Sequence, residues 1–134
     1  MPEYLNALKE TTATLKLMPT SCATEQLSAE IDFTKYIGNV KIVINSTRGT
    51  DNDEVLTPTL YCGAVTGTYA TLTATGATIL GGTNEAATGK VVEINIDASA
   101  CLRFGKVKLT PTGTTPAHVA CVTVIGIVRQ GATL

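Results

Sequence analysis

His118 is the only histidine in the sequence, so any general-base or metal-binding chemistry that needs an imidazole depends on this residue. Cys121 follows three positions later, inside a run of β-branched residues that predicts a strand. Because successive strand residues point to opposite faces, two residues three positions apart do not converge on one ion. The sequence therefore favours a histidine at the end of a loop over a zinc ligand.

The four cysteines are widely spaced and include no Cys-x-x-Cys pair: Cys22, Cys62, Cys101 and Cys121. Cys62 and Cys121 fall in strand patterns and not at helix N-termini, which lower the pKa of a thiol, so neither is expected to be a nucleophile. In a chain without a secretory pattern, buried free thiols are the favoured interpretation. A Cys62–Cys121 or a Cys22–Cys101 bridge stays open, because sequence does not fix the pairing.

Acidic residues offer two further candidates. Asp51, Asp53 and Glu54 lie in one polar loop, but the loop lacks the repeated Asp pattern and the glycine of an EF-hand, so a solvated acidic loop is favoured over a calcium site. Glu93 and Asp97 share one face of a predicted strand, where solubility explains them more simply than acid–base catalysis. We therefore expect no catalytic residue, no metal ligand and no cofactor.

Charge and hydropathy exclude several partners. Lys and Arg number 10 against 11 Asp and Glu, and no basic run exists, so the chain lacks the positive footprint of a nucleic-acid-binding protein. No apolar span approaches the length that crosses a bilayer, and the first residues do not have the pattern of a signal peptide. We expect a protein made in the cytoplasm, with neither a nucleic-acid nor a membrane partner.

The elements that carry these residues are predicted to be strands. Thr is abundant, Trp is absent, and from Ile31 onward short strand patterns alternate with turn residues, as in a sandwich or barrel. Val91 to Asp97 and Arg103 to Pro111 alternate cleanly between apolar and polar positions. Leu56 to Gly63 contains Pro58, which predicts an edge strand or a bulge. Together, these patterns predict an all-β, antiparallel β-sandwich of seven or eight strands.

Residues 1 to 30 differ from the rest of the chain. Tyr4, Leu5 and Leu8 share one helical face, which predicts a short helix over roughly residues 3 to 10. Thr11 to Leu17 alternates and predicts an extended segment. These patterns favour an N-terminal arm over residues 1–30 and a β-sandwich domain over residues 31–134.

The segment from His118 to Arg129 is the most apolar run in the chain and is predicted to be a central strand. A strand with one wet face should alternate, but here both sets of alternate positions are apolar. The two sets are Val119, Cys121, Ile125 and Ile127, and Ala120, Val122, Val124 and Val128. Both faces are therefore expected to be covered, one of them by a partner subunit. Arg103 and Arg129 are the expected interface charges.

Several segments occur in an order that resembles one family of small phage proteins: Ser28 to Phe33, Val55 to Leu60, Gly67 to Leu72, Gly89 to Ile94, Arg103 to Val107 and Gly113 to Ala117. Over about residues 25 to 130, the chain resembles the head decoration, or cement, proteins of tailed bacteriophages. The resemblance implies a jelly-roll β-sandwich that forms a homotrimer on the capsid exterior and bridges major capsid proteins. It supplies no catalytic residue, and four cysteines are not expected of that family.

The sequence thus predicts a non-enzymatic structural protein of the virion that stabilises a phage capsid from outside. The alternative is a carbohydrate-binding or receptor-binding β-sandwich on a phage or cell surface. Four Tyr, two Phe and no Trp argue against that alternative, because few aromatic rings are available to stack on sugars. An enzyme of the cupin kind is not expected, since it collects several histidine ligands.

Overall fold

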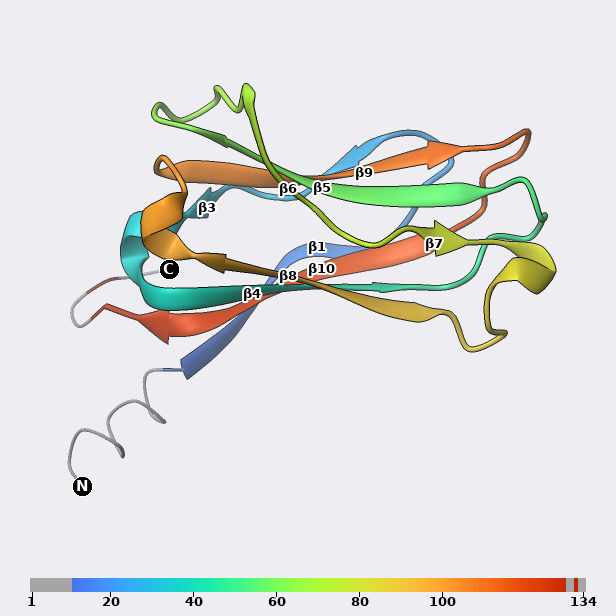
Figure 1. The fold of residues 1–134 in the computed structure, drawn as a ribbon, viewed down its shortest axis with the longest axis horizontal. Helices are drawn as coiled ribbons and strands as arrows, with labels where there is room; N and C mark the ends of the chain where they lie inside the picture. Colours follow the sequence, from blue (N-terminus) through green and yellow to red (C-terminus); the bar gives the residue numbers. More distant parts are fainter. Residues whose placement is uncertain (1–10, 130–131, 133–134) are drawn as a thin grey trace.

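The computed structural model describes residues 11–129 and residue 132, and these form two antiparallel sheets packed face to face (Figure 1). The four-stranded sheet has the order β1 (Thr11–Ser21), β10 (Val119–Val128), β4 (Tyr36–Ser46) and β8 (Lys90–Asp97). The six-stranded sheet has the order β2 (Gln26–Leu27), β9 (Phe104–Thr112), β5 (Val55–Gly63) and β6 (Thr71–Thr75), with β3 (Ile31–Asp32) beside β9 and β7 (Ile79–Leu80) beside β5. Three short 3-10 helices join strands: η1 (Phe33–Lys35), η2 (Gly82–Asn84) and η3 (Ala98–Ala100).

The strands pair like the two arms of one long hairpin that has been rolled up. β1 pairs with β10, β2 with β9, β4 with β8 and β5 with β6, all antiparallel. This nesting is the jelly-roll topology. Seven of the ten strands in the described part of the chain are five residues or longer, so the predicted fold class is confirmed.

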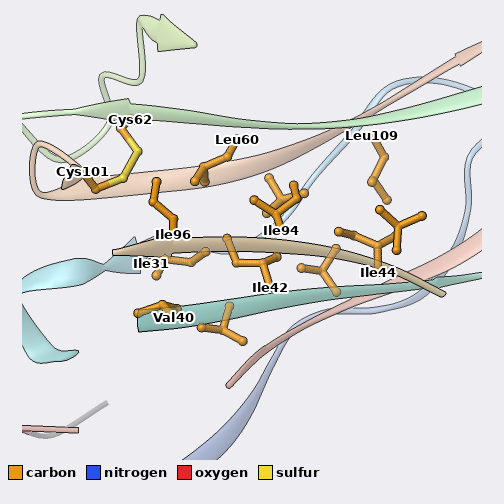
Figure 2. Packing of buried hydrophobic residues seen from close by; sticks show 14 of the residues in the cluster. Ile31, Val40, Ile42, Ile44, Leu60, Cys62, Ile94, Ile96, Cys101 and Leu109 are labelled. Atoms are coloured by element: carbon orange, nitrogen blue, oxygen red, sulfur yellow. A yellow bond between two sulfur atoms is a disulfide. The ribbon is translucent and has the colours of Figure 1, made fainter. Parts of the chain in front are cut away.

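The core lies between the two sheets and is built from alternate strand residues (Figure 2). The alternate apolar positions of β4, β8 and β9 are all buried, and they are Val40, Ile42, Ile44, Val92, Ile94, Ile96, Val107 and Leu109. Outward positions of β8, such as Glu93 and Asn95, are exposed. The period of two in the sequence therefore identifies which face of each sheet is the inner one.

β10 is central, as its sequence predicts, because it lies between β1 and β4. Its even positions, Val122 and Val124 among them, are buried in the core. Its odd positions, including Ile125 and Ile127, are half-buried, and Val119 is exposed. Within residues 11–129, only one face of this strand is packed on the core. The covering of the other face by a partner subunit stays a prediction.

Thr11 to Leu17 is extended as expected, but it lies in β1 and not in an arm apart from the sandwich. β1 pairs with β10 from Thr11 opposite Ile127 to Ser21 opposite Val119. β2, which also falls before residue 31, pairs with β9. Residues 11–30 thus form part of the sandwich, because β1 is paired as an edge strand of the four-stranded sheet and β2 is paired with β9. The helix predicted over residues 3 to 10 lies outside the described residues.

Pro58 lies in a strand at the centre of the six-stranded sheet, although an edge or a bulge was expected. The main-chain oxygen of Pro58 accepts a hydrogen bond from the Gly76 nitrogen at 2.9 Å. In a strand, the nitrogen of a residue faces the same neighbour as its oxygen, so the Pro58 nitrogen also faces Gly76. Gly76 lies between the end of β6 and the start of β7, where no ladder donor is needed.

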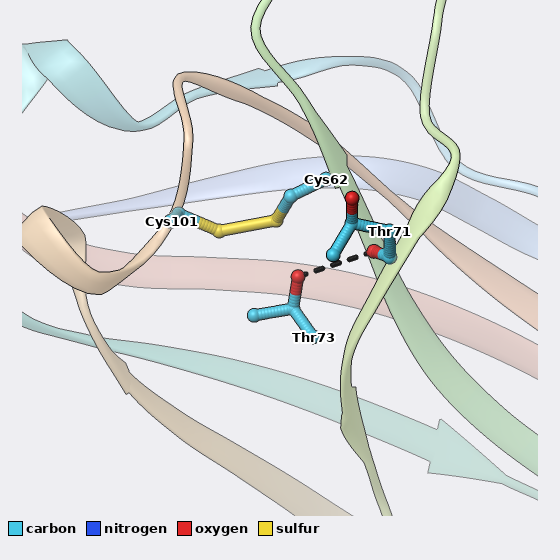
Figure 3. The surroundings of a disulfide bond; sticks show 4 residues. All are labelled: Cys62, Thr71, Thr73 and Cys101. Atoms are coloured by element: carbon cyan, nitrogen blue, oxygen red, sulfur yellow. Dashed lines mark hydrogen bonds between the residues drawn. A yellow bond between two sulfur atoms is a disulfide. The ribbon is translucent and has the colours of Figure 1, made fainter.

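Cys62 and Cys101 form a disulfide that spans 39 residues of sequence (Figure 3). Both pairings left open by the sequence are therefore wrong, and the free-thiol interpretation holds only for Cys22 and Cys121. The reason is the register of β5 and β9, in which Cys62 lies opposite Gly105. The turn before β9 carries Cys101 to this same end of β5, with a Cα–Cα distance of 6.3 Å.

Candidate functional site

His118 lies at the end of the loop before β10, as expected, and its side chain is completely buried. Its Nε2 atom lies 3.0 Å from the Leu80 carbonyl oxygen, while its Nδ1 atom has no hydrogen-bond partner. Cys121 is half-buried on the outer face of the four-stranded sheet. The structure therefore does not bring His118 and Cys121 together, in agreement with their odd spacing.

The acidic loop is solvated only in part. Asp51 and Asp53 are exposed, but Glu54 is completely buried. The Asp51 nitrogen donates to Glu54 Oε2 at 2.7 Å, and Glu54 Oε1 has no partner. Glu54 and His118 both have an atom within 3 Å of the point that a Gly49 Cβ would occupy. The expectation of a solvated loop is wrong for Glu54, because the loop folds back and places this side chain beneath Gly49.

The two exposed carboxylates of this loop take part in hydrogen bonds to a neighbouring loop. The carboxylate of Asp53 accepts hydrogen bonds from the Thr114 nitrogen and hydroxyl at 3.0 and 2.9 Å. The carboxylate of Asp51 accepts from the Thr115 hydroxyl at 3.1 Å. Within residues 11–129 and 132, no three His, Cys, Asp or Glu side chains gather as a metal site would require. The acidic side chains instead join the loop before β5 to the loop before β10.

These loop hydrogen bonds make the fold sensitive to acid. The Thr114 hydroxyl and nitrogen lower the pKa of Asp53, and the Ser99 hydroxyl and nitrogen lower the pKa of Asp97. A lowered pKa in the folded state means that the unfolded chain binds more protons at acidic pH. The stabilisation is therefore present above the unfolded pKa of about 4 and is lost as the pH falls through the folded values.

We accordingly expect the melting temperature to fall progressively below about pH 4. Circular dichroism melts at one protein concentration between pH 7 and pH 2.5 would measure it. Asp53→Asn and Asp97→Asn should each make the decline shallower. A melting temperature that stays constant down to pH 2.5 would contradict this view of the two carboxylates.

One broad surface does emerge, on the outer side of the four-stranded sheet. Residues opposite each other in the ladder share a face, so Ala13, Ile125 and Lys41 lie side by side across β1, β10 and β4. We call the surface the outer apolar face, and its members are Ala13, Leu15, Met18, Ile37, Val43, Val91, Val119, Cys121, Ile125 and Ile127.

Several large apolar side chains of the outer apolar face are strongly exposed. Its five most exposed large side chains keep 40–71% of their surface in contact with solvent, and they are Leu15, Met18, Ile37, Val91 and Val119. A hollow of about 560 Å³ lies at one end of this face, between Pro19, Val91 and Val119. The Lys41–Glu93 ion pair, at 3.5 Å, lies within this face, because Lys41 is opposite Ile125 and Glu93 is opposite Val43. Exposed apolar side chains gathered on one face in this way are typical of an interaction site.

A second surface lies on the outer side of the six-stranded sheet and was missed in the sequence. Tyr61 and Tyr69, two of the four tyrosines, line one groove together with Lys106 and Lys108. The alternation within each strand predicts that Tyr61, Lys106 and Lys108 point outward. The sequence alone does not give the register that places Tyr61 opposite Lys106.

The fold and these two outer faces define the class: an antiparallel jelly-roll β-sandwich with two candidate binding surfaces. No protein-family model matches the sequence, and no curated protein matches it. In the described ranges, no helix is long and apolar enough to span a bilayer.

Solved structures share this fold. A structure of infectious bursal disease virus, Gx strain, is 14% identical with a TM-score of 0.53, over 92% of this chain and 34% of that one. VP2 of the same virus in a subviral particle is 13% identical with a TM-score of 0.52, over 90% and 33%. The CBM22-1–GH10 modules of xylanase 10B from Clostridium thermocellum, in complex with xylohexaose, are 12% identical with a TM-score of 0.50, over 94% and 26%.

These identities show the fold alone. The chain spans about a third of the length of the viral chains that it matches. The β-sandwich is thus shared with a protein that forms a virus particle and also with modules crystallised with a sugar.

Proposed function

We propose that this chain is a non-enzymatic structural protein of a virion: a homotrimeric decoration protein that binds the outside of a phage capsid and bridges major capsid proteins. The outer apolar face is the observation that supports the proposal most directly. Among the described residues, the core packs against only one side of its central strand, β10, and a second chain covering the other side would explain the apolar residues there. The sandwich is also a fold that a particle-forming viral protein uses.

The energetics of the face favour association. Complete burial of one Val, Leu, Ile or Met side chain contributes about 1.5–3 kcal/mol. Leu15, Met18, Ile37, Val91 and Val119 are exposed enough to gain part of that amount when covered. Closed symmetry would bury the same patch in every subunit, and a trimer would hold the capsid through several weak contacts at once.

An enzymatic role has less support. A nucleophile needs a base within hydrogen-bond reach, and the free thiol of Cys121 lies on the outer face while His118 is buried in the loop end. Burial raises the pKa of the other free thiol, Cys22, which makes it a poorer nucleophile. The proposal therefore assigns both cysteines to packing.

A matched pair of variants tests the outer apolar face. Leu15→Glu combined with Met18→Glu places two charges on it, and we expect the protein to elute as a monomer where the unmodified chain has the mass of three chains. Leu72→Glu is the control, because Leu72 is 54% exposed against 52% for Leu15 but belongs to β6 of the other sheet. Size-exclusion chromatography with light scattering gives the masses.

A monomeric unmodified chain across concentrations would contradict the trimer, and a trimeric double variant would contradict this choice of face. Co-sedimentation with purified capsids tests the location on the virion separately. We expect the unmodified chain and Leu72→Glu to sediment with capsids and the double variant to remain in the supernatant.

A further inference from the structure

The groove on the outer side of the six-stranded sheet has the composition of a ligand site. It is a hollow of about 370 Å³ at the surface of β5 and β9. Its lining includes two half-buried tyrosines, two lysines, Leu27 and one carboxylate, Glu25. The outer apolar face belongs to the opposite sheet, so a trimer formed through that face leaves this groove open.

Sheet register arranges the groove side chains in alternation. Lys106 and Lys108 are two residues apart on β9, so both point outward, and Tyr61 on β5 lies opposite Lys106. The Lys108 ammonium lies 5.0 Å from the centre of the Tyr61 ring, and the Lys106 ammonium lies 5.3 Å from the centre of the Tyr69 ring. Aromatic and cationic groups therefore alternate along the groove, each cation held near a ring.

Tyr69 is fixed in place although it comes from the loop between β5 and β6. Its hydroxyl donates to Glu30, which also accepts from the Thr66 hydroxyl at 2.6 Å. The Gly67 nitrogen donates to the Tyr69 hydroxyl oxygen at 3.1 Å. These bonds hold the ring in one orientation before any ligand arrives, which lowers the entropic cost of binding.

The charges of the groove do not cancel. Lys108 forms an ion pair with Glu25, with 3.6 Å between Nζ and Oε1. In the part of the chain that the structure describes, no ion pair reaches Lys106. The groove thus offers one uncompensated ammonium group next to two aromatic rings, with the Glu25 carboxylate at its border.

We propose that this groove binds a carboxylated sugar, such as a uronic acid unit of an acidic polysaccharide. The apolar face of the pyranose ring packs on a tyrosine ring, and the sugar carboxylate accepts a charge-assisted hydrogen bond from Lys106. Glu25 accepts hydrogen bonds from sugar hydroxyls. Nucleic acid fits less well, because only two lysines line the groove and the sequence has no basic run. The inference does not depend on the proposed role at the capsid.

Isothermal titration of the full chain with trigalacturonate tests the proposal, with the methyl-esterified trisaccharide as a probe of equal size without charge. We expect the free acid to bind about tenfold more tightly than the ester, as one charge-assisted hydrogen bond implies. Lys106→Gln should remove that difference. Tyr61→Ala should weaken both probes by about tenfold through loss of the ring contact.

Lys41→Gln is the control variant, because it removes a lysine from the four-stranded sheet, and it should bind as the unmodified chain does. Lys106→Gln keeps the proposal testable even where Tyr61→Ala unfolds the chain, since a surface lysine is not part of the core. Three results would overturn the proposal: no binding of the acid, equal binding of acid and ester, or a single-stranded oligonucleotide displacing the acid with higher affinity.

Discussion

Replacing Cys62 and Cys101 together by alanine is expected to lower the free energy of unfolding by about 4 kcal/mol. The disulfide closes a loop of 39 residues, and the estimate follows from the chain entropy that such a loop removes from the unfolded state. Both sulfurs are buried, so the bond is also part of the packing between β5 and the turn before β9. Urea unfolding followed by circular dichroism, at one protein concentration, measures the change.

Cys121→Ala serves as the control for the loss of a sulfur, because that thiol is free and half-buried, and it should change the free energy by less than about 1 kcal/mol. Unfolding of the unmodified chain in the presence of a reductant should reproduce the double variant. Equal stability with and without the reductant would contradict the assigned role of this disulfide.

A second large effect is expected at Gly126, which interrupts the apolar positions of β10 on the core side. A Cβ added there would lie 2.7 Å from Cδ1 of Tyr36, a residue of β4 that is completely buried. The tyrosine ring occupies the space that a side chain at position 126 would need. We expect Gly126→Ala to destabilise the fold by about 1–3 kcal/mol, the usual cost of overpacking a core.

Combining Gly126→Ala with Tyr36→Leu separates this explanation from a general loss of β10. The smaller side chain makes room for the new methyl group, so the two changes together should cost less than the sum of their separate effects. Thr123→Ala, on the outer side of the same strand, should have a small effect, within about 0.5 kcal/mol. Strict additivity in the urea measurements would contradict a direct contact between ring and methyl group.

Much of the fold was predictable wherever an alternating pattern reports burial on one face. β8 shows this best, since its inward isoleucines are buried and its outward Glu93 is exposed. The alternation of Thr11 to Leu17 predicted an extended segment but not its place in the sheet, because apolar positions such as Leu15 face outward and not into the core. An edge strand with an apolar outer side has no distinct sequence signal. Only its pairing with β10 reveals it.

The candidate surfaces were harder to predict, because they depend on contacts between distant segments. The lack of alternation in β10 did point to an uncovered face. The groove, the Cys62–Cys101 bridge and the burial of Glu54 all depend on which residues of separate strands and loops lie opposite each other. Sequence patterns give the direction of a side chain along one strand, and register gives its neighbours.

The pairing of β1 with β10 has a consequence for how the chain reaches this structure. Thr11 lies opposite Ile127, so the edge of the four-stranded sheet cannot form until the chain as far as Ile127 has left the ribosome. Folding is slow because the entropy of closing such long loops is lost before any contact compensates for it. Sandwiches of this kind fold in milliseconds to seconds. Until then β4 has no β10 beside it, and its run of Val40, Ile42 and Ile44 is open to other nascent chains. Aggregation during synthesis, more than unfolding of the finished sandwich, is therefore the main hazard that this topology creates.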